Sequence, residues 1–356
     1  MALALDEGAG PSAPVVQAPE SQLKSLSASL PGAVGGARDR PPSREDHGPA
    51  LHPASRLPDR LYKLILVALA SSVVAALALV TWQLYDLARP ALHRFGFSFL
   101  GISGWDPTSD EFGAFPFLIG TLLTATEALV LAVPLGLGTA IFLSEIADKR
   151  LQRWVRFPIE MLAAVPSVVY GLWGIGQLAP LLRLHVEPAL IGTGLSIFSG
   201  PALGVGVLAA GLVLAVMVFP TVVALSLEVF RAVPREQREA FYALGATRWE
   251  MVQKGLLPYS RNGLFGAILL ALGRALGETM AVAMVIGNNP DLVRSLLGTS
   301  STLASVIANE FTEAVGDLHR AALAELGLVL LGITLLLAIA ARLLVRAIGR
   351  SFKVNA

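Results

Sequence analysis

The sequence contains no cysteine and little charge, and these two shortages set its class. Without cysteine the chain forms no disulfide and offers no thiolate to a metal ion. Charged residues make up only 15% of the 356 residues, whereas hydrophobic residues make up 54%. A soluble globular domain carries roughly a quarter charged residues, so this composition indicates an integral membrane protein.

The residue patterns of a catalytic or metal site are also missing. The sequence has no G-x-x-x-x-G-K-[ST] motif, so we expect the chain neither to bind nor to hydrolyse ATP. No Ser/His pair or His/Asp cluster falls at membrane depth, which argues against a membrane-embedded hydrolase. The histidines show no ligand spacing, and we interpret them as ordinary loop residues: His47, His52, His93, His185 and His319. We therefore predict no catalytic residue, no cofactor, no metal site and no nucleic-acid partner.

What the sequence does contain begins with residues 1–59, which are rich in proline, alanine, glycine and serine. Such a composition cannot bury enough surface to offset chain entropy, so we predict a disordered cytoplasmic tail over 1–59. The tail has no basic start followed by a short apolar core and is therefore not a secretory signal. It is either a tolerated extension or a regulatory, partner-binding segment.

Six apolar segments follow, each about as long as the 20 residues that a membrane-spanning helix needs. They are 61–84, 117–143, 159–182, 203–230, 263–287 and 321–344. Basic residues gather before the first segment and after the second, fourth and sixth, which places both termini in the cytoplasm. The sequence thus predicts an all-α polytopic membrane protein with six transmembrane helices. Its core is expected over 116–346, with a basic cytoplasmic tail over 347–356.

Three details of these segments bear on function. Pro166, followed by Gly171 and Gly174, predicts broken backbone at membrane depth, which is tolerated only where protein or a water-lined cavity satisfies it. No internal repeat is visible, which argues against an inverted-repeat secondary transporter. The loop 94–117 is rich in aromatic residues. It either meets the outer membrane surface or an extracytoplasmic partner, or packs its aromatic side chains on itself.

A long polar stretch, 231–262, separates the fourth and fifth segments. Pro234 suits a first helical turn, and Gly245 fits the left-handed position that ends a helix. The helix between them is expected to carry one apolar face, formed by Ala240, Phe241 and Leu244.

A second helix is expected to begin at Arg248, because Thr247 and Glu250 have the spacing of a capping box. Gly255 and Pro258 are expected to end this helix before the membrane. The two helices form either a rigid knob for a partner's groove or an amphipathic hairpin on anionic lipid.

Arg274 and Glu278 fall in the middle of the fifth segment, four residues apart, so one continuous helix would let them pair. An arginine at the membrane centre costs about 2.5–3.5 kcal/mol on insertion scales and faces a protein interior or a cavity. Either Arg274 offers its guanidinium to an oxyanion during passage, with Glu278 holding it between transits, or the pair only joins helices. Glu127 is a weaker pathway candidate. Small residues beside the pair allow another helix to approach: Gly266, Gly273 and Gly277.

The polar stretch resembles the EAA loop of bacterial ABC-importer permeases, which runs Glu-Ala-Ala, three residues, Gly, nine residues, Ile, one residue, Leu-Pro. The matching positions are Glu239, Ala240, Gly245, Leu257 and Pro258. Phe241 replaces the third-place alanine, and Gly255 replaces the isoleucine. The resemblance implies a type I ABC-importer permease fold and a loop that docks on a cytoplasmic ATPase.

The resemblance narrows with three further segments, 112–147, 159–174 and 274–289, which are similar to the PstC family of high-affinity phosphate importers. It implies a permease of the bacterial inner membrane that imports inorganic phosphate. The implied partners are a PstA-like second permease, two PstB-like ATPase subunits and a periplasmic PstS-like phosphate-binding protein. The alternatives are the sister PstA family or a permease for sulfate or molybdate and, from another class, an ion-coupled secondary transporter.

Overall fold

A computed structural model describes residues 56–351, and all regular structure in this range is helical, which confirms the all-α class. Two isolated backbone bridges, Asp106 with Glu111 and Gly287 with Ser300, are the only strand-like pairings in the range. The predicted disordered tail lies outside the described residues up to residue 55, and a helix already begins at Arg56. The end of the predicted basic tail, from residue 352, lies outside them as well.

The chain divides into two units at residue 67, within the first described helix, and the account below concerns the second unit. The long helices are α2 (Arg56–Phe95), α3 (Phe115–Ile141), α4 (Lys149–Ala164), α8 (Val207–Arg231), α11 (Leu257–Gly277) and α14 (Asp317–Ser351). The shorter helices are α5 (Ser167–Trp173), α6 (Ala179–Leu181), α7 (Glu187–Ile191), α9 (Arg235–Ala243), α10 (Arg248–Met251), α12 (Met280–Val285) and α13 (Leu303–Glu310). The 3₁₀ turns are η1 (Gly96–Leu100) and η5 (Ser196–Phe198). The π turns are η2 (Phe142–Ile146), η3 (Gly174–Leu178), η4 (Leu182–Val186) and η6 (Val252–Leu256).

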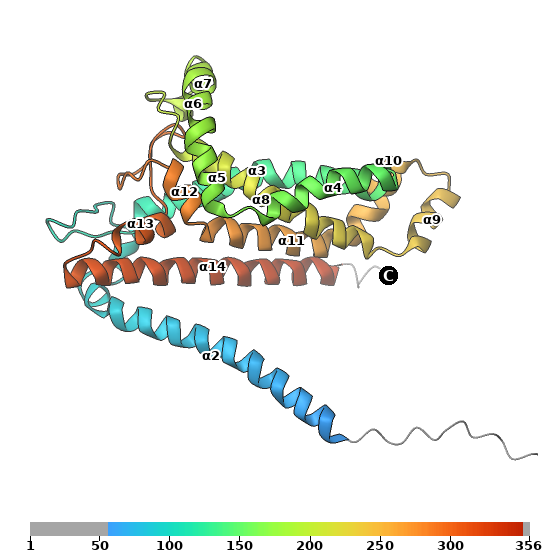
Figure 1. Ribbon diagram of the computed structural model, residues 1–356, viewed down its shortest axis with the longest axis horizontal. Helices are drawn as coiled ribbons and strands as arrows, with labels where there is room; N and C mark the ends of the chain where they lie inside the picture. The colour runs from blue at the N-terminus through green and yellow to red at the C-terminus, as the bar shows by residue number, and fades with distance from the viewer. Residues whose placement is uncertain (1–55, 352–356) are drawn as a thin grey trace, which may run out of the picture. The chain divides into compact units, whose positions relative to one another are not determined.

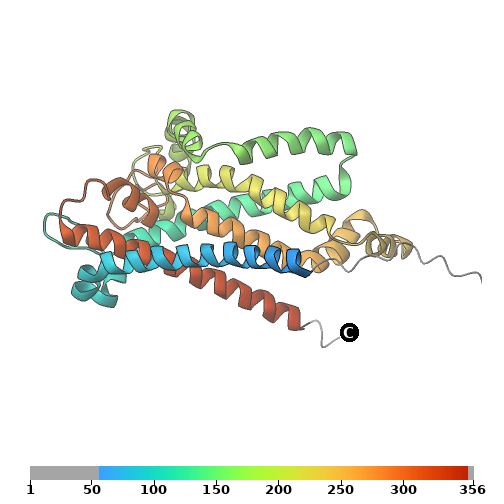
Figure 2. The same cartoon turned by 60° about the horizontal axis from the view of Figure 1, so that its bottom comes forward.

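Helices α3, α8, α11 and α14 run along a common direction (Figures 1 and 2). Their buried centre consists mainly of alanine and valine from α3, α8, α11 and α12. Glycine lets α3 and α8 approach closely, since a Cβ added at Gly136 would lie 2.7 Å from the side chain of Val222. Small residues at the contact are typical of helix packing in membranes, where close backbone approach replaces the hydrophobic effect.

Four of the described helices, α2, α3, α8 and α14, are each long and apolar enough to cross a membrane. The bent pair formed by α4 and the helical run from α5 to α7 raises that number to five. The fifth predicted segment, 263–287, is not one continuous helix, which corrects the prediction. α11 ends at Gly277, and α12 begins only at Met280.

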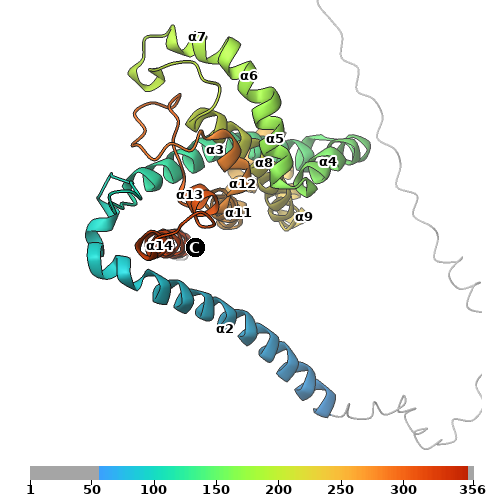
Figure 3. The ribbon, with the colours of Figure 1, turned by 60° about the vertical axis from the view of Figure 1, so that its left-hand side comes forward.

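The third predicted segment is broken where Pro166 predicted. α4 and the α5–α7 run meet at 97°, and Figure 3 shows α6 and α7 leading away from α3 and α8. Val165 is extended, because the residue before a proline is driven out of the helical region. α4 also begins earlier than predicted, at Lys149, with Asp148 as its N-cap. The basic cluster after the second segment therefore lies inside a helix.

The aromatic loop packs largely on itself. Phe99, Trp105 and Phe112 are buried in one cluster with Phe117, while Phe97 is 94% exposed. His319 is not an ordinary loop histidine: it lies in the first turn of α14 and stacks on the ring of Phe112.

The carboxylate of Glu310 ties this cluster to the end of α13. One oxygen, Oε2, accepts from Trp105 Nε1 at 2.9 Å and lies 3.0 Å from His319 Nε2. The first turns of α14 are thus held to the loop that follows α2 by both stacking and polar contacts.

Candidate functional site

The polar stretch between α8 and α11 forms the two predicted helices, α9 and α10. Gly245 lies between them with a φ of +80°, in the left-handed region that favours glycine. The capping box is confirmed: the Thr247 hydroxyl accepts from the Glu250 amide, and the Glu250 carboxylate accepts from the Thr247 amide at 2.9 Å. These hydrogen bonds from Thr247 lower the pKa of Glu250 below its usual value.

The second helix does not end at Gly255 and Pro258, which corrects the prediction. α10 continues through the π turn η6 into α11, and the Leu257 amide donates to the Val252 carbonyl five residues earlier. Pro258 has no amide to donate and its ring crowds the carbonyl four residues before it, so a wider turn accommodates it. The chain is consequently helical from Arg248 to Gly277.

The segment from Leu244 to Leu256 has one side buried against the rest of the chain and one side exposed. Met251, Val252 and Leu256 are buried against the ends of α3 and α8. On the open side Leu244 is 86% exposed and Trp249 is 60% exposed. The EAA-type residues Glu239, Ala240, Gly245 and Pro258 are also exposed, and Leu257 is half-buried. An apolar surface held on a rigid base is suited to binding a protein partner.

Arg274 and Glu278 do not pair as predicted. Glu278 is extended and lies in the break between α11 and α12, so the two residues no longer share a helix face. The Glu278 carboxylate accepts instead from the Ala281 amide at 3.2 Å, at the start of α12. Among the described residues no ion pair or hydrogen bond joins Glu278 to Arg274.

The other broken helix is stabilised by Tyr170, a residue that the sequence analysis did not single out. Pro166 cannot donate to the Leu162 carbonyl, and the buried Tyr170 hydroxyl donates to that oxygen at 2.7 Å. α5 packs on α12, because a Cβ at Gly171 would lie 3.2 Å from the Cα of Ala281. Both helix breaks therefore lie in one region.

Arg274 is exposed on the surface of this chain, on the same side as Gly273 and Gly277. A Cβ added at either glycine would meet no atom within 4 Å. An arginine at membrane depth faces protein or water rather than lipid. The chain alone leaves Arg274 uncovered, so this face requires a second protein surface or a water-filled path.

Glu127 lies in α3 against α8, where the absence of a side chain at Gly211 makes room for it. A Cβ at Gly211 would come within 2.3 Å of the Glu127 carboxyl group. Both carboxyl oxygens are buried and have no hydrogen-bond partner among the described residues. The geometry places Glu127 between two helices of this chain.

Comparison with known proteins places the chain among membrane transport components. The sequence model of the family described as "Binding-protein-dependent transport system inner membrane component" matches residues 132–353. A "Phosphate transport system permease protein PstC" of Mesorhizobium japonicum is 42% identical over 302 residues, covering 83% of this chain and 92% of that protein. The protein with the same description from Haemophilus influenzae is 44% identical over 291 residues, covering 80% and 90%.

The fold is also similar to that of a solved transporter. One chain of a bacterial alginate ABC transporter, in complex with an alginate pentasaccharide-bound periplasmic protein, superposes with a TM-score of 0.55. The two sequences are 15% identical, and the match covers 82% of this chain and 98% of that one. This likeness concerns the fold alone.

Proposed function

Because this chain belongs to the family of binding-protein-dependent transport system inner membrane components, we propose that it is the permease subunit of an ATP-driven importer of inorganic phosphate. The observation that carries this proposal is the helix running from Arg248 to Gly277. It joins an exposed apolar surface outside the membrane to an arginine within it. A partner that moves the exposed surface can thereby move Arg274.

The exposed surface is the site at which a separate ATPase acts. The residues assigned to coupling are Glu239, Ala240, Gly245, Leu257 and Pro258. Their support is the resemblance to the EAA loop together with the buried side of the α10–η6 segment and the exposed side chains of Leu244 and Trp249. The permease itself carries no nucleotide-binding motif, so two partner ATPase subunits hydrolyse ATP.

Arg274 is the anion-binding residue of the pathway. Its planar guanidinium offers paired donors to a phosphate oxyanion, and its exposure leaves those donors available. Glu278 sets the start of α12 by accepting from the Ala281 amide, and its negative charge opposes tight binding of an anion in the path. Glu127 is the weaker candidate, since its oxygens are enclosed by α3 and α8. A second permease subunit completes the path over the uncovered face of α11.

Phosphate as the solute rests on the relatives, which are named phosphate transport permeases and are matched over about nine-tenths of their length. The arginine chemistry alone serves phosphate, sulfate and molybdate equally, so it does not make that choice. A periplasmic phosphate-binding protein delivers the solute and supplies much of the selectivity.

The test is uptake of labelled phosphate by proteoliposomes that contain the chain, its partner permease, the ATPase subunits and the binding protein. We expect uptake that needs ATP and is not displaced by sulfate or molybdate. Arg274→Ala is expected to reduce it strongly and Arg274→Lys less, with the exposed Arg150→Ala as the matched control.

Three results would contradict parts of this proposal. Near-normal uptake by both Arg274 variants removes Arg274 from the pathway. Displacement by sulfate or molybdate identifies another oxyanion as the substrate. Phosphate movement by the chain alone under an ion gradient establishes a secondary transporter instead.

A further inference from the structure

Arg238, in the middle of α9, holds three parts of the chain together. Its Nη2 donates to Glu145 Oε1 at 3.1 Å and to the Phe230 carbonyl at 2.7 Å. Its Nη1 donates to the Val233 carbonyl at 3.2 Å. One guanidinium thus joins α9, the π turn η2 that ends α3, and the C-terminal end of α8.

The contacts of Arg238 are largely shielded from water. The side chain of Glu145 is only 6% exposed and that of Arg238 is 21% exposed, so this ion pair is largely shielded from water. The Phe230 carbonyl, in the last turn of α8, also accepts from the Val233 amide at 3.2 Å, and the Val233 carbonyl lies two residues beyond the end of the helix. A partly buried, charge-assisted arrangement of this kind is stronger than an exposed ion pair.

Besides Arg238, α9 is held by the half-buried ring of Phe241, which packs against Gly255 of η6 and against the buried cluster at the ends of α3 and α8. None of its residues is buried, in contrast to Met251, Val252 and Leu256 in the α10–η6 segment. α10 and η6 are joined to α11 by continuous helix, so movement of the loop reaches α11 along the backbone. Movement of α9 reaches α3 and α8 through side chains, by the packing of Phe241 and by the hydrogen bonds of Arg238.

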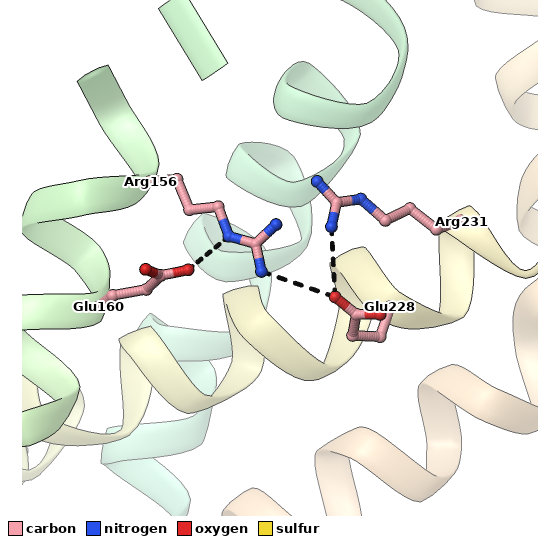
Figure 4. A network of polar contacts seen from close by, with 4 residues as sticks. All are labelled: Arg156, Glu160, Glu228 and Arg231. Carbon is pink, nitrogen blue, oxygen red and sulfur yellow. Dashed lines mark hydrogen bonds and ion pairs between the residues drawn. The ribbon is translucent and has the colours of Figure 1, made fainter. Parts of the chain in front are cut away.

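The end of α8 that receives Arg238 also contacts α4. Glu228 Oε1 lies 3.3 Å from Arg231 Nη1 and 3.7 Å from Arg156 Nη2, and Arg156 also pairs with Glu160 (Figure 4). These pairs are about half exposed, so each is weak by itself. They nevertheless extend the connection from α9 through α8 to α4, the helix that precedes the break at Pro166.

We propose that Arg238 is a positioning residue that transmits movement of α9 to α3 and α8, a second coupling route beside the helix into α11. This inference rests on the proposed function, because it assumes a partner ATPase that moves the loop. It assigns a transmission role to the Arg238–Glu145 contact, which lies inside this chain rather than on the ATPase surface.

The experiment uses the complete transporter in proteoliposomes and measures phosphate uptake and ATP hydrolysis in the same sample. For Arg238→Ala we expect ATP hydrolysis to continue while phosphate moved per ATP falls about tenfold or more, the factor for losing one charged hydrogen bond. Glu145→Gln keeps the size and removes the charge, and it is expected to lower the ratio less. Arg150→Ala serves as the control, because Arg150 is exposed on α4 at the same end of the bundle.

A charge reversal separates transmission from simple folding. Arg238→Glu alone places two carboxylates together, whereas Arg238→Glu with Glu145→Arg restores an ion pair in the opposite sense. We expect the double variant to recover part of the phosphate-to-ATP ratio that the single variant loses.

An unchanged ratio in assembled Arg238→Ala and Glu145→Gln complexes overturns the inference alone. Failure of all these variants to assemble with the partner subunits makes Arg238 purely structural and overturns it too. If the wild-type complex itself shows no ATP-dependent phosphate uptake, the proposed function fails, and the inference fails with it.

Discussion

The ring of Phe241 lies against Gly255, at the point where α9 crosses η6. A Cβ added to Gly255 would come within 2.7 Å of Phe241 Cε2. These are the two positions at which the chain departs from the EAA pattern, where alanine and isoleucine are expected. The EAA pattern has a small residue at position 241 and a large one at position 255, and this chain has the reverse. The large ring of Phe241 therefore fills the space that an isoleucine side chain at position 255 would fill.

Exchanging the two sizes tests this packing. Gly255→Ile by itself should destabilise the transporter by about 1–3 kcal/mol, because the new side chain overlaps the ring. Phe241→Ala should leave a cavity. The double variant Phe241→Ala with Gly255→Ile should recover much of the loss, as measured by thermal unfolding of the purified complex. Additive losses in the double variant would show that the two positions do not share one space.

Tyr170→Phe should lower stability by about 1 kcal/mol, because it leaves the Leu162 carbonyl without its hydroxyl donor. Tyr85→Phe is the matched control, as Tyr85 is exposed on α2. Equal thermal midpoints for the two variants would remove Tyr170 from the stabilisation of the break.

Gly211→Ala should reduce the amount of folded protein, because its Cβ overlaps the Glu127 carboxyl group. Adding Glu127→Ala removes the overlapping atoms and should restore folding in the double variant. Gly138→Ala in α3 is the control, since a Cβ there meets no atom within 4 Å. The measurement is the yield of monodisperse protein from membranes. A harmless Gly211→Ala would mean that Glu127 turns away from α8.

The capping box at α10 should make the start of this helix sensitive to acid. The pKa of Glu250 is lowered in the folded chain, so its contribution is present above the ordinary value of 4.5 and is lost as pH falls through the lowered value. Amide exchange in the first turn of α10 should therefore rise in acid. Glu250→Gln should show no such rise. An identical acid response in both proteins would contradict this account.

The uninterrupted apolar helices were the most predictable elements. The predicted segments 117–143 and 203–230 lie close to α3 and α8, and 321–344 lies inside the longer α14, because long apolar runs and basic ends specify each helix locally. The break at Pro166 was equally predictable, since a proline has no backbone N–H to donate within a helix. The break at Glu278 was not, because no proline marks it and the apolar composition continues into α12.

The candidate site was predictable only where its residues are close in the sequence. The capping box of Thr247 and Glu250 and the turn at Gly245 follow from local spacing. The contact of Arg238 with Glu145 joins residues 93 positions apart, and no local sequence pattern predicts it. The predicted pairing of Arg274 with Glu278 was wrong for a related reason. A spacing of four residues implies contact only within one continuous helix, and α11 ends at Gly277.

The π turn η6 also sets the direction in which the membrane arginine points. Each residue of an α-helix turns the next side chain by about 100°, and a π turn absorbs one extra residue within the same rise. Everything beyond Leu256 is therefore out of phase with α10 by about one residue step. The orientation of Arg274 relative to the exposed surface of Leu244 and Trp249 is thus fixed by a single extra residue, and removing one residue from η6 would rotate Arg274 relative to that surface.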